Sequence, residues 1–200
     1  MKSRFLAQMT ALSLGLIFTG VSFAGDTISK PKVLSDETIS LSEKLSKNYD
    51  TIVIREFTTS KPEYNYVNDK EKAVIEKMTP NLLRTITDTC EAELKDKKLF
   101  KQIVKSGKPS GKAVILEGEI IEFNAGSKAL KMFVGYGAGK VYLKIKGRLV
   151  DAETGKELAS FEERETGYLG SMTSMSFDDV YPIQAKNIGE NLAKFIEKIY

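Results

Sequence analysis

Residues 141–166 read VYLKIKGRLVDAETGKELASFEERET. Apolar and polar residues alternate over 141–149, which is the period of a strand with one buried and one solvated face. Residues 151–156 have the composition of a turn, and residues 158–166 return as an antiparallel partner. Across this pair the acidic residues Glu162, Glu163 and Glu165 can face the basic residues Lys144, Lys146 and Arg148.

Before this strand pair, β-branched or apolar runs predict short strands at residues 49–57, 99–105 and 114–123. A helix begins near Asp69, with apolar residues at steps of three and four. This stripe consists of Val74, Met78, Leu82, Leu83, Ile86, Cys90 and Leu94. Pro80 interrupts the helix, so either Thr79 caps a new helix or the helix kinks there.

A second long helix closes the chain. Its apolar stripe consists of Tyr181, Ala185, Ile188, Leu192, Phe195, Ile196 and Ile199. Asp178 or Asp179 is expected to cap this helix rather than Ser176, because either aspartate places Pro182 in the first turn. The element order is then β-α-β-β-β-β-α. It indicates an α+β domain at residues 49–200, with a mainly antiparallel sheet and two long helices packed on it.

The first 24 residues have the features of a secretory signal peptide. Lys2 and Arg4 precede an apolar run, and Ser22-Phe23-Ala24 matches a signal peptidase site. We therefore expect a periplasmic or secreted protein without a lipid anchor, because Gly25 rather than cysteine follows the cleavage site. Residues 25–48 are polar and are expected to form a flexible leader.

Composition narrows the possible functions. The 200 residues carry a net charge of only +3, which gives no general attraction to nucleic acid. Histidine is absent, which removes the commonest general base and metal ligand, so no enzyme activity, metal or cofactor is expected. The single cysteine, Cys90, lies on the apolar helix stripe and is expected in the core. The lysine-rich residues 95–112 are interpreted as a solvated helix end and turn.

Two apolar loops are the best candidate for a functional site. The loops that flank the strand pair begin and end at the same edge of the domain, so they are neighbours in space. The expected partner-binding residues are Met132, Phe133, Tyr136, Tyr168, Leu169 and Met172, on a loop backbone that includes Gly135, Gly137 and Gly139. Methionine and aromatic side chains make adaptable contacts with a protein partner. The alternative is that they fold back to close a local core.

The loop Gly135-Tyr136-Gly137-Ala138-Gly139-Lys140 also allows a small-ligand or nucleotide site, since closely spaced glycines bring backbone N–H groups near an anion. Its spacing does not match a P-loop, because Val134 and Val141 stand where glycine and Ser/Thr are required. Phe133 and Tyr136 with flanking lysines allow a third role, contact with a membrane surface.

Four motifs carry a resemblance to a known family. They are Glu117-Gly118-x-Ile120, Gly126-Ser127-x-Ala129, Gly135-x-Gly137-Ala138-Gly139-Lys140 and Val150-Asp151-Ala152-x-Thr154-Gly155-Lys156. Over residues 50–200 the chain resembles a family of secreted bacterial domains of unknown function. It is more distantly similar to periplasmic modules of the TolB N-terminal, curli-secretion-lipoprotein and penicillin-binding-protein-activator type. This resemblance implies binding to another envelope protein rather than catalysis.

Cleavage after Ala24 can be tested by mass. The intact mass of the protein purified from the periplasm is expected to correspond to a chain that begins at Gly25, because small residues stand at the two positions that the peptidase reads. A full-length chain recovered from the membrane fraction would contradict the prediction.

Overall fold

The computed structural model describes residues 32–105, 109, 111–127, 139–166 and 175–200. The signal peptide and the start of the expected leader, residues 25–31, lie outside these ranges. In the described part of the chain, no helix is long and apolar enough to cross a membrane.

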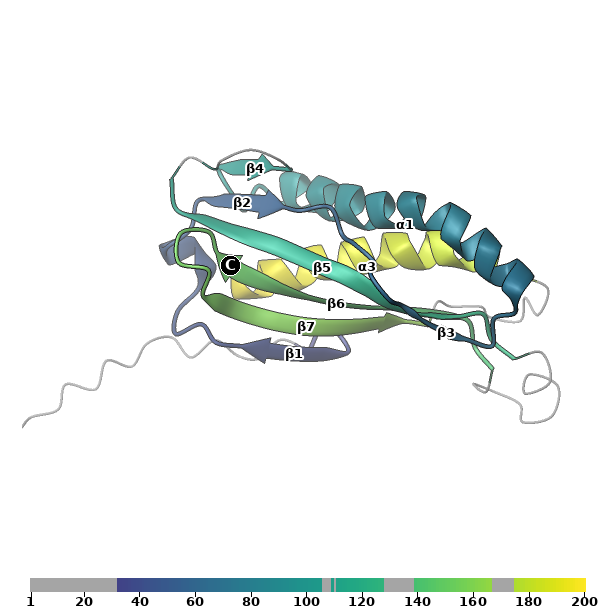
Figure 1. The fold of residues 1–200 in the computed structure, drawn as a ribbon. Helices are drawn as coiled ribbons and strands as arrows, with labels where there is room; N and C mark the ends of the chain where they lie inside the picture. The colour runs from purple at the N-terminus through teal and green to yellow at the C-terminus, as the bar shows by residue number, and fades with distance from the viewer. Residues whose placement is uncertain (1–31, 106–108, 110, 128–138, 167–174) are drawn as a thin grey trace, which may run out of the picture.

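Seven strands form one mixed sheet (Figure 1). Its path is β1 (Asp36–Ile39), β7 (Glu157–Glu165), β6 (Tyr142–Asp151), β5 (Ala113–Asn124), β2 (Thr51–Ile54) and β4 (Gln102–Val104), with β3 (Glu63–Asn65) beside the end of β5. The β1–β7, β7–β6 and β6–β5 pairs are antiparallel, whereas β2 and β3 run parallel to β5 and β4 runs parallel to β2. The predicted α+β fold is confirmed, and part of its sheet is parallel.

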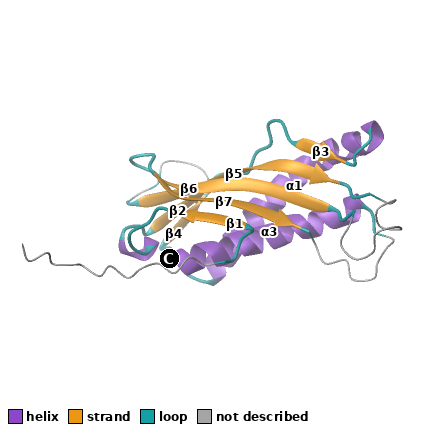
Figure 2. Ribbon diagram, turned by 90° about the horizontal axis from the view of Figure 1, so that it is seen from below, coloured by secondary structure: helices purple, strands orange, loops and turns teal. Residues whose placement is uncertain are grey.

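Helices α1 (Asp69–Asp96) and α3 (Phe177–Ile199) cover the same face of this sheet (Figure 2). Gly189 of α3 lies against Ile86 and Cys90 of α1, and Lys97 pairs with Glu197 at 2.9 Å near the ends of both helices. The helices therefore run in the same direction. Both begin at the end of the sheet where β5 ends (Figure 1).

Two glycines at the centre of the sheet let aromatic rings pack directly on the strand backbones. Gly118 of β5 pairs directly with Gly147 of β6. A Cβ atom at Gly147 would lie 2.5 Å from the ring of Phe161, and one at Gly118 would overlap the ring of Phe57. Phe161 also packs on Phe195 of α3, with ring centroids 5.7 Å apart. The aromatic rings thus fill the space between the central strands and the helices.

The leader expected to be flexible over residues 25–48 has defined structure over residues 32–48. Within residues 32–48, β1 pairs with β7, and a turn of 3-10 helix (η1, Leu45–Lys47) follows. Leu45 is fully buried. Ser35 donates from its backbone N–H and its hydroxyl to Glu163, both at 2.7 Å. A polar segment is ordered here because the long strand β7 offers it a free edge.

The helix termini also differ from expectation. α1 continues through Pro80, and Thr79 caps no new helix because its hydroxyl donates to the Ile75 carbonyl one turn earlier, at 2.7 Å. Ser176 is the N-cap of α3, and its N–H donates to the Asp179 carboxylate at 3.3 Å. The cap predicted at Asp178 or Asp179 is therefore wrong. Asp179 lies inside the helix, at its third residue, and its carboxylate accepts from the N-cap in a capping box.

The packed faces of the helices are largely as predicted. Every residue of the α3 stripe is fully buried. In α1, Leu82, Ile86, Cys90 and Leu94 are buried, but Val74 is 45% exposed and Ile75 occupies the core in its place. The prediction for the start of α1 is thus wrong by one residue, which is a rotation of about 100° on a helix.

Two substitutions on α3 test this packing. Leu192→Ala should lower the free energy of unfolding by about 2–5 kcal/mol, because it leaves a cavity in the core. Lys194→Ala, on the exposed side of the same helix, should change it by only a few tenths of a kcal/mol. Urea unfolding of both variants measures the difference, and equal small effects would contradict the packing described.

Candidate functional site

The predicted partner-binding residues lie almost entirely outside the described part of the chain. This applies to Met132, Phe133, Gly135, Tyr136, Gly137, Tyr168, Leu169 and Met172, which belong to residues 128–138 and 167–174. Gly139 is described and has a positive φ of 72°. Met175, at the end of the second segment, is partly buried and packs against the core.

The structure does describe where the two segments are attached. Asn124 at the end of β5 pairs with Tyr142 at the start of β6, and Leu143 pairs with Glu165 at the end of β7. The strand ends that flank residues 125–141 and 166–176 are therefore neighbours, as the sequence predicts. We call this end of the sheet, which α1 and α3 also share, the loop end (Figure 1).

Close backbone contact fixes the base of the segment that joins β5 to β6. Gly126 has a φ of 77°, and a Cβ atom there would overlap the carbonyl oxygen of Gly139. The side chain of Asn124 accepts the Gly126 N–H at 2.9 Å. From α3, the Gln184 amide donates to the Val141 carbonyl at 3.0 Å. The segment thus leaves the sheet from a fixed position, with both of its ends held.

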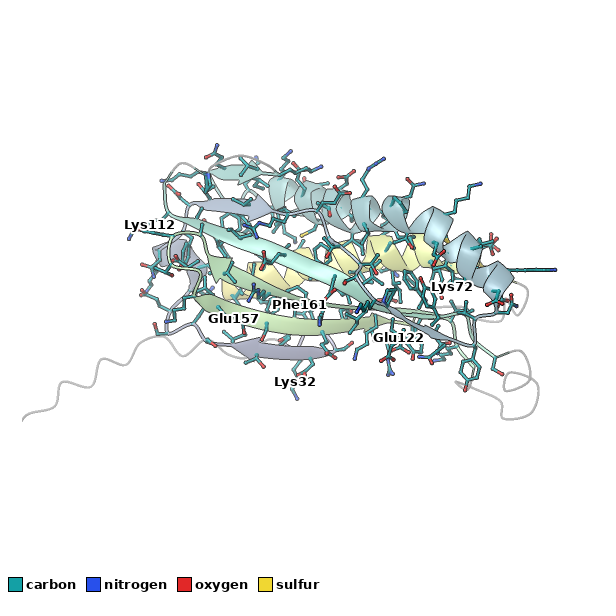
Figure 3. The ribbon with its side chains drawn as sticks, in the orientation of Figure 1. Lys32, Lys72, Lys112, Glu122, Glu157 and Phe161 are labelled. Atoms are coloured by element: carbon teal, nitrogen blue, oxygen red, sulfur yellow. The ribbon has the colours of Figure 1, made fainter. Side chains whose placement is uncertain are left out.

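A small hollow of about 340 Å³ opens at the loop end. Its lining residues are Tyr66, Asn124, Gly139, Lys140, Tyr142, Arg164 and Thr166. Beside it, the Glu122 carboxylate accepts hydrogen bonds from the Tyr142 hydroxyl and the Asn65 amide. The Arg164 guanidinium lies over the Tyr142 ring, 5.4 Å from its centroid. Figure 3 shows Glu122 at this end, on the face away from the helices.

Burial and Glu122 both act on Tyr142, a tyrosine that lines the hollow. Partial burial, together with the hydrogen bond to Glu122, raises the pKa of Tyr142 above its usual value. The hydroxyl, which an ordinary tyrosine also keeps protonated at neutral pH, acts as a donor to Glu122. This bond orients the ring on which Arg164 lies.

Unsatisfied polar atoms lie near the same end. Among the described residues, three buried side-chain oxygens have no hydrogen-bond partner: Glu37 Oε2 in β1, the Tyr181 hydroxyl and the Gln184 carbonyl oxygen. The last two belong to the start of α3, and Tyr181 packs on Phe123 near the end of β5. Most buried polar groups in proteins are paired, and exceptions often mark functional sites.

The open face of the sheet has a different character. It forms a shallow depression of about 570 Å³ crossed by ion pairs: Arg148 with Glu117 (2.7 Å), Lys146 with Glu119 (3.0 Å) and Lys144 with Glu162 (2.6 Å). The predicted charge pairing across β6 and β7 holds for Glu162. It is wrong for Glu163, which turns to the helix face and accepts from Ser35 and Asn191.

The ion pairs also affect how the carboxylates of the open face titrate. Partial burial acts to raise the pKa of Glu117, but Arg148 and Arg55 lower it below its usual value. A general acid needs a raised pKa, so Glu117 is not suited to that role. The arrangement explains the acidic residues of β5 as partners of basic neighbours.

Cys90 and the lysine-rich residues 95–112 make contacts that stabilise the fold. Cys90 is fully buried, and this burial raises the pKa of its thiol far above the ordinary value, which disfavours the reactive thiolate. Several cations of the lysine-rich stretch pair with nearby acids: Lys95 with Glu91, Lys101 with Asp50, and Lys105 with Asp88 and Glu91. The described residues contain no group of three or more potential metal ligands.

Sequence reasoning missed several residues of the loop end. Tyr66 is 60% exposed, with a positive φ of 54° that its sequence context does not indicate. Arg164 occupies an exposed position of β7. The alternation of that strand is the signal in the sequence that could have placed its side chain on the open face. Asn65 and Glu122 meet because β3 pairs with the end of β5, a contact that depends on the fold.

Comparisons with known proteins give one family match. The family model described as "Domain of unknown function (DUF4410)" matches residues 52–171. No curated protein matches the chain. The family match supports the expected resemblance to a group of unknown function, whereas the more distant likeness to TolB-type modules stays a prediction.

Several solved structures match the chain at low similarity. A PelC dodecamer from Paraburkholderia phytofirmans is 12% identical, with a TM-score of 0.42 over 78% of this chain and 96% of that chain. A DUF330 protein from Xanthomonas campestris is 6% identical, with a TM-score of 0.47 over 72% and 81%. A protein from Caulobacter crescentus described as a lipoprotein is 12% identical, with a TM-score of 0.37 over 71% and 86%.

Gly126 and Gly155 have similar positive φ values, so substitutions there distinguish the cost of the close contact at the loop base from the cost of the backbone conformation alone. Gly126→Ala should destabilise the protein by more than about 2 kcal/mol, because a positive φ and an overlap with Gly139 add together. Gly155→Ala should lower stability by only about 1–2 kcal/mol, since its φ is 70° but no atom lies within 4 Å of the added Cβ. Equal losses in urea unfolding would show that the contact at the loop base contributes nothing.

Proposed function

The chain belongs to the family of domains of unknown function DUF4410, and from this premise we propose that it is a non-enzymatic module that binds another protein of the cell envelope through its loop end. The predicted signal peptide supports an extracytoplasmic location for this role.

One observation carries the proposal. Among the described residues, the large hydrophobic side chains that stand exposed are Tyr66, Val74 and Ile183, at 60%, 45% and 48%. Tyr66 follows β3, and Val74 and Ile183 lie in the second turns of α1 and α3. All three are therefore at the loop end, where the segments rich in methionine and aromatic residues are attached. Apolar groups gathered at one end of a protein are typical of an interaction surface.

The rest of the described surface offers less to a protein partner. The open face of the sheet is crossed by ion pairs that satisfy its charges internally. Exposed pairs of this kind add little affinity for a partner because they are already solvated and neutralised. The loop end combines apolar side chains with the lining of the hollow, which is the composition of many protein interfaces.

A double substitution tests the proposal. Tyr66→Ser with Ile183→Ser removes exposed apolar area and should change the free energy of unfolding by less than about 1 kcal/mol. Binding should weaken severely, because apolar anchors that become desolvated in a complex often contribute about 2 kcal/mol or more each. Crosslinking and affinity capture from an envelope extract, with the captured proteins identified by mass, measures the binding.

Two further variants sharpen the result. Phe133→Ser with Tyr136→Ser should also abolish capture if the predicted loop residues contribute. Lys112→Ser with Glu153→Ser alters exposed residues at the opposite end of the sheet without changing the net charge, and should capture the same protein as the wild type (Figure 3 labels Lys112). Capture by the Tyr66 and Ile183 variant at the wild-type level would contradict the proposal. So would salt-sensitive sedimentation with lipid vesicles in the absence of any protein partner.

A further inference from the structure

Two cations at the loop end differ from the others on the open face. Arg55, Lys144, Lys146 and Arg148 each form an ion pair with a glutamate of β5 or β7. Across the described ranges, Arg164 and Lys140 have no acidic partner within ion-pair distance. Both line the same hollow of about 340 Å³, whose lining contains no acidic residue. Among the described residues, the donors of these two cations therefore remain open to a ligand in the hollow.

The arginine is held in a defined orientation. Its guanidinium lies over the Tyr142 ring, and the hydroxyl of that ring donates to Glu122. The backbone N–H of Arg164 donates to the Ser35 hydroxyl at 3.0 Å, which fixes the strand at this position. A guanidinium stacked on an aromatic ring keeps its N–H edges available. These edges form the planar fork that binds both oxygens of a carboxylate.

The nearby acids do not occupy the donors of Arg164 or Lys140. Glu122 accepts two hydrogen bonds, and its charge also acts on Lys144, whose pKa is raised mainly by the hydrogen bond to Glu162 and further by the charge of Glu122. Glu165 follows Arg164 in β7, so strand alternation places it on the helix face, opposite the hollow. One arginine and one lysine without an ion-pair partner among the described residues thus remain to meet an incoming anion.

The donors of the hollow match a small planar anion. Its volume leaves room for a side chain that carries such a group. Besides Arg164 and Lys140, the lining provides the hydroxyl groups of Tyr66 and Thr166. Phosphate sites usually add several backbone N–H groups or more cations, whereas a carboxylate is satisfied by one fork and one or two further donors.

On the basis of the proposed function, we infer that the loop-end hollow binds a carboxylate of the protein partner, from a glutamate or aspartate side chain or from a chain terminus. The exposed ring of Tyr66 at the rim then contacts apolar atoms next to that carboxylate. An acidic residue adjacent to a hydrophobic one is accordingly the chemistry that the partner presents.

A titration with a simple acidic peptide tests this inference. The probe is an acetylated and amidated hexaglutamate, added to the 15N-labelled protein at low salt and followed by NMR. The amide signals of Tyr66, Lys140 and Thr166 should shift. The Lys140→Gln/Arg164→Gln variant should bind about tenfold more weakly, because it loses two charge-assisted contacts.

A matched control separates a specific site from general charge. Lys77→Gln with Lys194→Gln removes the same two charges from exposed positions on the helices and should weaken binding less than twofold. The single substitution Lys140→Gln should leave the fold intact, because Lys140 is exposed. It should still weaken binding of the peptide. Equal weakening in both double variants, or shifts spread over the whole surface, would overturn the inference.

Two further outcomes distinguish a carboxylate ligand from a phosphate ligand, and failure of this inference from failure of the proposed function. Binding of inorganic phosphate or of phosphatidylglycerol vesicles through Arg164 and Lys140, without binding of hexaglutamate, would overturn the carboxylate inference in favour of a phosphate ligand. If hexaglutamate fails to bind but Tyr66→Ser/Ile183→Ser still abolishes capture of the envelope protein, the inference fails and the proposed function stands.

Discussion

The close contact between aromatic rings and the glycine pair Gly118–Gly147 is the constraint on which the packing of this protein depends. The central strands β5 and β6 carry no side chains at this pair, so Phe57 and Phe161 lie directly against their backbones. Phe161 then reaches Phe195 of α3. Any side chain at either glycine would push the helices away from the sheet, because interiors are packed to the density of organic crystals.

This one-sided core divides the molecule into surfaces with different roles. The helices bury one face of the sheet, and the opposite face is stabilised by ion pairs between neighbouring strands. The strand ends and both helix starts converge on the loop end, where polar atoms are buried without partners and apolar side chains are exposed. In natural proteins, such departures from optimal packing are most often found at functional sites.

Much of the fold could be predicted because it follows from local patterns. The alternation over residues 141–149 and the stripe of α3 each repeat with the period of the element that forms there. Short elements were harder to predict from the sequence. β1 and η1 consist of polar residues with few apolar positions, and β3 has three residues, so local sequence carries too little signal to separate them from loops.

The candidate site shows the same limit more clearly. The alternation of 141–166 was sufficient to predict that the loops at the two strand ends are neighbours, because antiparallel pairing alone requires it. The charge balance of the hollow could not be predicted, since it depends on which cation finds an acidic partner across the sheet. Arg148 meets Glu117 of β5 rather than a glutamate of β7, and Arg164 meets Tyr142.

The sequence by itself determined the α+β class, the strand pair, the buried stripe of α3 and the place of the loops in the chain, because periodicity and turn chemistry act between near neighbours. Only the tertiary structure decided that β1 joins the sheet, that Glu163 turns inward, and that Arg164 and Lys140 share a hollow. These features require residues from distant parts of the chain to meet, and the pairing register, not local preference, selects their partners.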